Sequence, residues 1–362
     1  MKYFFLVGER SGDLHTSNLA AQLKNLDPGF SGKGFGGEAM QQQGIDLVCG
    51  LERLSFMGFW EVVKNLRTIR QNFKMAKQAI LDFQPDVIIL VDYPGFNLRL
   101  AKWCKQNGFK IAYYILPQVW AWKENRIKQL KEYCDCRIGV LPFEKEFYAK
   151  HKVDMKFVGH PLLDLVPLRR GQGEVSPLER GRGVSDRVAL LPGSRKQEIN
   201  RLMPIFIDVA RQFSQENFVV AGLTILEELY PKELPSNMSM AWDNTYSVLQ
   251  NSKAAIVCSG TATLETALLQ VPQVVVYKTG FINAQIVKRV AKVSFASLPN
   301  LIVGEKIIEE LLQWDCTPEK IGNELTKLMQ SDPALMYAKL STKIGEPGAS
   351  AKAAKIIFNL AG

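Results

Sequence analysis

The segment Asp86–Asn97 constrains the fold more than any other part of the chain. It contains an unbroken apolar run, Val87 to Val91, that is rich in β-branched residues. Such a run is typical of a strand buried on both faces, in a parallel sheet covered by helices. Asp92 ends the run and Pro94-Gly95 turns the chain at once, so Asp92 is predicted at the carboxyl end of the strand, where open α/β sheets bind ligands. A helix cap or turn carboxylate is the alternative role.

The chain opens with a related unit. Tyr3–Val7 is a short apolar strand, Gly8–Asp13 a glycine-containing turn, and Leu14–Leu26 an amphipathic helix. The glycines permit a tight turn, and the start of the helix offers free N–H groups to an anion. A plain connecting turn capped by Ser11 or Asp13 would account for the same residues. Strand, turn and helix in this order begin a doubly wound α/β domain.

With 362 residues the chain is long enough for two such domains. Residues 167–186 are rich in Gly, Arg, Glu and Ser and lack apolar periodicity, which predicts a linker. We therefore expect a first Rossmann-like domain over 1–166 and a second over 187–346. The tail, 347–362, is predicted to be a helix that can cross back to pack on the first domain.

The second half repeats the pattern of strand, glycine turn and helix. Val188–Leu191 is the predicted strand and Gln197–Phe213 the helix, and the turn between them contains Gly193, Ser194 and Arg195. Backbone N–H groups, a helix dipole and a guanidinium group together suit a diphosphate. A capped helix with solvated charges is the alternative.

A second candidate turn follows the predicted strand Ala254–Val257. Ser259-Gly260-Thr261 opens a helix that carries Glu265, which is placed to accept hydrogen bonds from ribose hydroxyls. An acidic residue near a helix start is also favourable without any ligand. Further along, Ser297–Leu301 is predicted to be a loop before a helix from about Glu305.

Residues 55–83 form a long predicted helical stretch in which bulky apolar side chains alternate with basic ones. This combination is found in helices that lie on anionic membranes. An ordinary helix with one face in the core has a similar pattern, and the pattern alone favours that interpretation. The residues of the membrane hypothesis are Phe56, Met57, Phe59, Trp60, Arg67 and Arg70.

Composition excludes several classes of protein. No apolar run is long enough to span a membrane, and no cleavage site follows the first strand, so a cytoplasmic protein is expected. The six cysteines and three histidines are too scattered for a metal site or a disulfide framework, and no cofactor is expected. The net charge of +9 fits a nucleotide phosphate or an acidic membrane surface. Nucleic acid is not expected, because no zinc finger or RNA-binding aromatic motif is present.

Eight motifs, in one order from the first strand to the last helices, resemble those of bacterial lipid-A-disaccharide synthases. They are Gly8-Glu9-x-Ser11-Gly12-Asp13, Asp92-x-Pro94-x-Phe96-Asn97, Pro117-x-Val119-Trp120-Ala121-Trp122, Leu141-Pro142-Phe143-Glu144, Gly159-His160-Pro161, Leu191-Pro192-Gly193-Ser194-Arg195, Ser259–Glu265 and Ser297–Leu301. The resemblance implies the two-domain fold of nucleotide-sugar glycosyltransferases, with two Rossmann-like domains facing a central cleft. It also implies a peripheral protein of the inner membrane, and leaves a homodimer open.

The family's reaction transfers a sugar from UDP-2,3-diacylglucosamine to 2,3-diacylglucosamine 1-phosphate. It gives a β-1,6-linked disaccharide and UDP, with inversion at the anomeric carbon and without a metal. The resemblance makes Asp92 the candidate base that deprotonates the acceptor hydroxyl. The expected acceptor-side residues are Glu9, Ser11, Asp13, Asn97 and Trp120. The expected UDP-binding residues are Gly193, Ser194, Arg195, Ser259, Gly260, Thr261, Glu265 and Asn300.

Two departures from the family pattern stand out. Arg10 occupies a position where a small residue is usual, and Gly95 one where an acidic residue is common. The second change leaves Asp92 as the carboxylate expected to act. Two other functions stay open at this point: a UDP-N-acetylglucosamine 2-epimerase with a soluble substrate, and a non-catalytic membrane-associated protein that binds a UDP-sugar.

Overall fold

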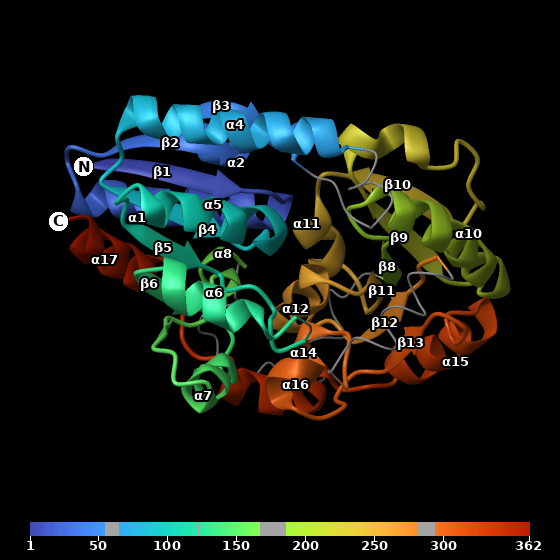
Figure 1. The fold of residues 1–362 in the computed structure, drawn as a ribbon. Coiled ribbons are helices and arrows are strands. Elements are labelled where there is room, and N and C mark those ends of the chain that lie inside the picture. Colours follow the sequence, from blue (N-terminus) through green and yellow to red (C-terminus); the bar gives the residue numbers. More distant parts are fainter. Residues whose placement is uncertain (55–64, 122, 167–185, 281–293) are drawn as a thin grey trace. The chain divides into compact units, whose positions relative to one another are not determined.

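The computed structural model describes residues 1–54, 65–121, 123–166, 186–280 and 294–362 (Figure 1). The chain forms two compact units. One comprises Met1–Asp164 together with Gly345–Gly362, and the other comprises Leu165–Ile344. Each unit is built on a parallel β-sheet, as the buried apolar runs predicted.

The sheet of the first unit has seven parallel strands in the order β3-β2-β1-β4-β5-β6-β7. Its strands are β1 (Lys2–Val7), β2 (Ser31–Gly36), β3 (Asp46–Gly50), β4 (Val87–Val91), β5 (Ile111–Tyr114), β6 (Cys136–Gly139) and β7 (Lys156–Phe157). The helices described here are α1 (Arg10–Leu26), α2 (Glu38–Gln42), η1 (Leu51–Arg53), α4 (Leu66–Phe83), α5 (Pro94–Gln106), α6 (Arg126–Tyr133), α7 (Glu144–Lys150), α8 (Leu162–Leu165) and α17 (Ala349–Ala361).

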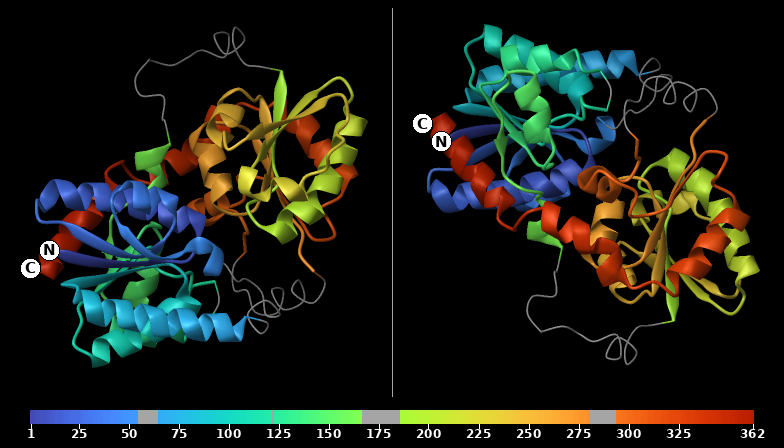
Figure 2. Two further views of the ribbon diagram at one scale, coloured as in Figure 1. Left: turned by 90° about the horizontal axis from the view of Figure 1, so that it is seen from above. Right: turned by 90° about the horizontal axis from the view of Figure 1, so that it is seen from below.

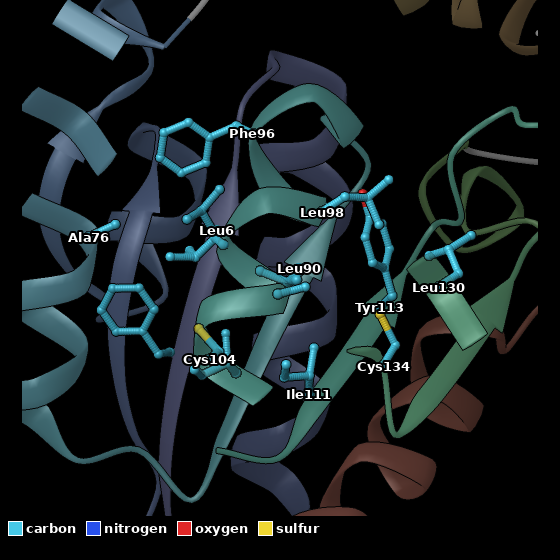
Figure 3. Packing of buried hydrophobic residues seen from close by; sticks show 14 of the residues in the cluster. Leu6, Ala76, Leu90, Phe96, Leu98, Cys104, Ile111, Tyr113, Leu130 and Cys134 are labelled. Carbon is cyan, nitrogen blue, oxygen red and sulfur yellow. The ribbon is translucent and has the colours of Figure 1, made fainter. Parts of the chain in front are cut away.

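Both faces of this sheet are covered. Helices α1 and α17 lie on one face, whereas α4 and α5 lie on the other (Figure 2). Alternate residues of a strand point to opposite faces, so Leu6 and Leu90 enter the core beneath α4, α5 and α6. In the same core the ring of Tyr113 lies among Leu98, Leu130 and Cys134 (Figure 3). Burying one large apolar side chain contributes about 1.5–3 kcal/mol.

Helix α17 is tied to the first unit by Asp164. The Asp164 carboxylate accepts hydrogen bonds from the backbone N–H groups of Gly348 and Ser350, and thereby caps the start of α17. From there the helix packs along α1 and against β4, β5 and β6. The last residues of the chain therefore complete the layer that α1 begins.

The second unit has six parallel strands in the order β10-β9-β8-β11-β12-β13. Its strands are β8 (Arg187–Leu191), β9 (Asn217–Gly222), β10 (Met238–Trp242), β11 (Ala254–Cys258), β12 (Gln273–Tyr277) and β13 (Glu310–Leu312). Its described helices are α10 (Lys196–Gln212), η2 (Thr224–Leu229), α11 (Thr245–Gln250), α12 (Thr261–Leu268), α14 (Leu298–Val303), α15 (Pro318–Leu328) and α16 (Pro333–Lys343).

One segment of the second unit differs from its prediction. The sequence predicted a loop at Ser297–Leu301 and a helix from about Glu305, but the helix is α14, and β13 follows it. Pro299 stands in the first turn of α14, where a missing N–H group breaks no helical hydrogen bond. The proline therefore starts a helix here and does not mark a loop.

Candidate active site

Each sheet offers one position suited to a ligand. The strand order reverses between β1 and β4 in the first unit, and between β8 and β11 in the second. Doubly wound sheets bind ligands beyond the carboxyl ends of their strands at such a reversal. The turns after these four strands begin at Gly8, Asp92, Pro192 and Ser259. They contain most of the residues that the sequence motifs singled out.

Asp92 lies in a strained turn. Its φ of 41° and the φ of 48° at Tyr93 fall in the left-handed region that L residues rarely adopt. The backbone carbonyl of Asp92 accepts hydrogen bonds from the Tyr113 hydroxyl at 2.5 Å and from Asn97 Nδ2 at 2.7 Å. These contacts hold the backbone in a conformation that costs of order 1–3 kcal/mol per residue. Strained backbone conformations of this kind are concentrated at functional sites.

Asn97 supports this turn from inside the protein. Its side chain is fully buried, and Nδ2 also donates to the Val91 carbonyl at 3.1 Å. Its position explains why an amide is needed, since Nδ2 donates to two carbonyls where the strand meets the helix. The geometry therefore gives Asn97 an indirect role, in which it fixes the backbone of Asp92.

The turn after β1 brings a second carboxylate to the same end of the sheet. Glu9 is partly exposed just before α1, and its charge adds to the burial that raises the pKa of Tyr93 to about 12. Ser11, in the first turn of α1, is also partly exposed. Glu9 therefore lies close enough to the turn of Asp92 to affect it electrostatically.

Asp13 has a structural role that its motif did not reveal. The side chain is buried, and its carboxylate accepts hydrogen bonds from the backbone N–H groups of Gly37 at 2.8 Å, Ala39 at 3.1 Å and Met40 at 3.3 Å. These are the free donors at the start of α2, which Asp13 therefore caps. An acceptor-binding role would compete with these three bonds.

Trp120 is buried beside Glu144, a residue for which the sequence analysis predicted no role. Its indole N–H donates to Oε1 of Glu144 at 3.4 Å, and the other oxygen of Glu144 accepts from Val140 N and Leu141 N, both at 3.0 Å. Burial raises the pKa of Glu144 to about 7; the three hydrogen bonds oppose this change and the charge of Asp92 adds to it. The only sequence signal for Glu144 was its place at the end of the Leu141–Glu144 motif.

In the second unit, the turn after β8 contains an internal carboxylate. Gly193 has a φ of 102°, and a Cβ there would lie 2.4 Å from Oε2 of Glu198. The same oxygen accepts from Ser194 N at 3.1 Å, and Oε1 lies 3.1 Å from Nη1 of Arg195. Through these two contacts the carboxylate of Glu198 fixes the positions of Ser194 and Arg195, two of the predicted diphosphate-binding residues.

The turn after β11 is open where a ligand is expected. Gly260 has a φ of 154°, and a Cβ there would meet no heavy atom within 4 Å among the described residues beyond its two chain neighbours, so there is free space beside Gly260 at the start of α12. Ser259 Oγ donates to the Ala296 carbonyl at 2.8 Å, which fixes the turn. Glu265 accepts a hydrogen bond from the Tyr246 hydroxyl at 3.0 Å. Burial raises the pKa of Glu265, whereas this hydrogen bond lowers it.

Asn300 is fully buried, and both ends of its amide are used internally. Nδ2 donates to the Ile308 carbonyl at 2.9 Å and to Glu310 Oε1 at 2.8 Å, and Oδ1 accepts from Ile307 N at 2.8 Å and Ile308 N at 3.0 Å. This arrangement assigns Asn300 to the support of its loop. Direct contact with a diphosphate or sugar would require these bonds to break.

The membrane hypothesis is only partly accessible to the structure. Phe56, Met57, Phe59 and Trp60 lie outside the described residues. Arg67 and Arg70 are exposed near the start of α4. Among the described helices none is both long and apolar enough to cross a bilayer. Within the same residues, no group of three or more His, Cys, Asp or Glu side chains is arranged to hold a metal ion.

Comparison with known proteins decides between the functions left open by the sequence. A model of the lipid-A-disaccharide synthetase family matches residues 3–347. The chain belongs to this family. The predicted resemblance is confirmed, and the chain is a glycosyltransferase.

Relatives in the family extend over the whole chain. The lipid-A-disaccharide synthase of Syntrophus aciditrophicus is 35% identical over 369 residues, covering 98% of this chain and 96% of that protein. The enzyme of the same name from Geobacter sulfurreducens is 34% identical and covers 100% and 97%.

Solved structures confirm the fold of two Rossmann-like domains. A UDP-N-acetylglucosamine 2-epimerase from Neisseria meningitidis has a TM-score of 0.66 at 13% identity and covers 99% of both chains. A glycosyltransferase of kitacinnamycin has a TM-score of 0.64 at 14% identity and covers 100% of this chain and 99% of its own. At such identities the likeness concerns the fold alone, so the epimerase does not compete with the family match.

Proposed function

We propose that this enzyme transfers 2,3-diacylglucosamine from UDP-2,3-diacylglucosamine to the 6-hydroxyl of 2,3-diacylglucosamine 1-phosphate. The products are the β-1,6-linked disaccharide 1-phosphate of lipid A biosynthesis and UDP. Membership of the lipid-A-disaccharide synthetase family carries this proposal. Relatives that bear the synthase name cover almost the full length of the chain, which supports the same substrates.

Asp92 is proposed as the general base. It takes the proton of the 6-hydroxyl while that oxygen attacks the anomeric carbon of the donor, so the configuration at that carbon inverts. The support is its position at the reversal of strand order and the strained backbone held by Tyr113 and Asn97. Glu9 and Ser11, which are partly exposed after β1, are proposed to contact the acceptor, and the buried Trp120 to form part of its wall.

The second unit is proposed to bind the donor. The helix starts at α10 and α12, with Gly193, Ser194, Arg195, Ser259, Gly260 and Thr261, supply N–H groups and one guanidinium group to the diphosphate. These groups stabilise the charge that develops on the departing UDP, so no metal is required in this mechanism. Glu265, oriented by Tyr246, accepts hydrogen bonds from the ribose hydroxyls.

Peripheral binding to an anionic membrane is also proposed, because both substrates carry acyl chains and Arg67 and Arg70 are exposed on α4. A homodimer is compatible with this function but is not needed for it.

The decisive experiment incubates the purified enzyme with both acylated sugars and follows UDP and disaccharide together. Equal amounts of both products, with the β-anomer formed and activity kept in EDTA, are expected. UDP release without disaccharide would contradict the transfer, and an α-linked product would contradict direct displacement. Activity lost in EDTA and restored by magnesium would contradict the mechanism without a metal.

A further inference from the structure

The turns that contain Gly8 and Asp92 begin at matching positions on two adjacent strands. Strands β1 and β4 pair in parallel with Val7 opposite Val91, and each turn starts at the next residue. The two turns therefore lie side by side at the carboxyl edge of the sheet. Their relative placement determines how far Glu9, which follows Gly8, stands from Asp92.

The ring of Tyr93 occupies the place that a side chain on Gly8 would take. A Cβ on Gly8 would lie 2.4 Å from Cγ of Tyr93, and 2.6 and 2.7 Å from its Cδ2 and Cδ1. These distances are far shorter than the 3.5–4.0 Å or so at which carbon atoms attract one another. Gly8 is buried and is not one of the residues with a positive φ. Glycine is therefore needed at this position for the close approach of the ring, and not for its backbone angle.

Two further contacts fix the Tyr93 ring. It stacks on the ring of the buried Phe96, with the centroids 5.8 Å apart and the planes inclined by 21°. Its hydroxyl donates a hydrogen bond to the carbonyl of the buried Leu54 at 2.8 Å. Because a single peptide group joins Tyr93 to Asp92, a displacement of this ring also displaces the backbone of Asp92.

We propose that Tyr93 is a positioning residue for the general base. Its ring, in contact with Gly8, sets the separation of the turns that contain Glu9 and Asp92, and thereby the place of the Asp92 carboxylate relative to the acceptor hydroxyl. A displacement of about 1 Å at a reacting group can slow a reaction about 10²-fold. The inference rests on the proposed function, because Tyr93 acts through the base of that reaction.

The first test removes the ring. Asparagine tolerates the left-handed backbone angle of this position, so Tyr93→Asn takes the ring away without adding backbone strain. We expect kcat per UDP-binding site to fall about 10–100-fold, whereas the KM of both sugars and the affinity for UDP change little. Tyr93→Phe keeps the ring and should keep most of the activity. A lower stability with an unchanged kcat in Tyr93→Asn would overturn the positioning role.

The second test approaches the contact from the other side. The methyl group added by Gly8→Ala must displace the ring, so a comparable fall in kcat is expected. In the Tyr93→Asn background the same substitution should cost little more, because no ring is left to displace. Additive losses would overturn the proposed contact. Gly29→Ala is the matched control, since a Cβ there would lie at an ordinary 3.4 Å from the nearest atom beyond its chain neighbours.

The third test asks whether Tyr93 acts through Asp92, and it also serves if Gly8→Ala does not fold. Adding Tyr93→Asn to Asp92→Asn should lower the residual rate little further, because no carboxylate remains to be positioned. A further loss as large as in the wild-type background would overturn the inference.

Denaturant midpoints of the Gly8 and Tyr93 variants, measured without substrate, distinguish this inference from the proposed function. Gly8→Ala should lower the midpoint in the wild-type background and much less in the Tyr93→Asn background. This result, with a wild-type enzyme that forms no disaccharide, would contradict the proposed function alone. Disaccharide formed at the normal rate by both the wild type and Tyr93→Asn would contradict the positioning role alone.

Discussion

The indole N–H of Trp120 donates to Oε1 of Glu144 at 3.4 Å, and both side chains are buried. Through this contact the loop after β5 is joined to the turn after β6, since Glu144 also accepts from two backbone N–H groups of that turn. A buried carboxylate that accepts three hydrogen bonds is held firmly in one position. Glu144 therefore determines where Trp120 lies.

The protonation of Glu144 should make stability depend on pH. Its pKa rises from 4.5 to about 7 on folding. At a pH between these two values, Glu144 is therefore protonated in the folded protein but ionised in the unfolded chain. The free energy of unfolding should therefore fall as the pH rises from about 4.5 through about 7, by a few kcal/mol, since a pKa difference of one is about 1.4 kcal/mol. Glu144→Gln should remove this slope in denaturant titrations at several pH values.

The matched control for this prediction is Glu146→Gln, an exposed residue on the same helix. The buried His15 and His160, whose pKa values are lowered to about 4 and about 3 by burial, cause the opposite slope below pH 6.5. That slope cancels when variant and wild type are compared. Identical pH profiles for Glu144→Gln and wild type would show that Glu144 stays ionised in the folded protein.

Asp92→Asn should abolish most transfer while leaving UDP binding intact. The amide keeps the shape of the side chain but cannot take a proton, and general base catalysis contributes typically about 10²–10⁴-fold in rate. Single-turnover transfer at saturating substrates measures the loss, and calorimetry with UDP provides the control. Near-normal transfer would remove Asp92 from the mechanism and make Glu9 the next candidate.

Arg195→Ala should weaken UDP binding by roughly 1.5–3 kcal/mol, the usual contribution of a hydrogen bond to a charged group. Because Arg195 also contacts the buried Glu198, the substitution leaves that carboxylate with one partner fewer. Glu198→Gln in the same background separates the two effects. Calorimetry with UDP is the readout, and an unchanged affinity in Arg195→Ala would mean that the guanidinium does not contact the diphosphate.

Tyr246→Phe should weaken UDP binding only by disturbing the proposed contact between Glu265 and the ribose hydroxyls. The hydroxyl of Tyr246 orients Glu265, and the loss of a neutral hydrogen bond is worth about 0.5–1.5 kcal/mol. The affinity for 2′,3′-dideoxy-UDP should not change, because that nucleotide lacks the hydroxyls that Glu265 is proposed to bind. An equal loss for both nucleotides would indicate a general disturbance of α11 and α12.

Arg67→Glu combined with Arg70→Glu should reduce binding to anionic vesicles, and added salt should reduce wild-type binding in the same direction. Lys352→Glu with Lys355→Glu is the control of equal charge, located on α17 at the opposite face of the sheet (Figure 2). Vesicle sedimentation distinguishes the two pairs. The same loss for both pairs would mean that overall charge attracts the vesicles without a defined surface.

The sequence predicted the parts of the fold that depend on local pattern. Val87–Val91 is β4 without a shift at either end, because a continuous apolar run before a charged residue and a proline leaves little freedom in the position of a strand. The motifs were equally informative, since four of the eight, those that contain Gly8, Asp92, Gly193 and Ser259, lie at the carboxyl ends of the strands where the order of a sheet reverses. Asp92 could therefore be located without the structure.

The supporting contacts could not be predicted, because their partners are distant in the sequence or ambiguous by type. Asp13 caps a helix that begins 25 residues later. Asn300 supports its loop by donating a hydrogen bond to the carboxylate of Glu310. A motif shows that such residues matter but does not show whether they contact a ligand or the protein. The burial of Asp13 and Asn300 and their hydrogen bonds to the backbone indicate the second alternative.

The capping of α17 by Asp164 has a consequence for synthesis on the ribosome. The first unit lacks its last helix until residues 165–344 have been translated, which takes about 10–40 s at bacterial-like rates of about 5–20 residues per second. During this interval the apolar side of α1 that α17 later covers is exposed to chaperones and to other nascent chains. A stop codon placed before Gly345 would make that exposure permanent, so shortened products should be cleared by proteolysis rather than accumulate as half-active enzyme.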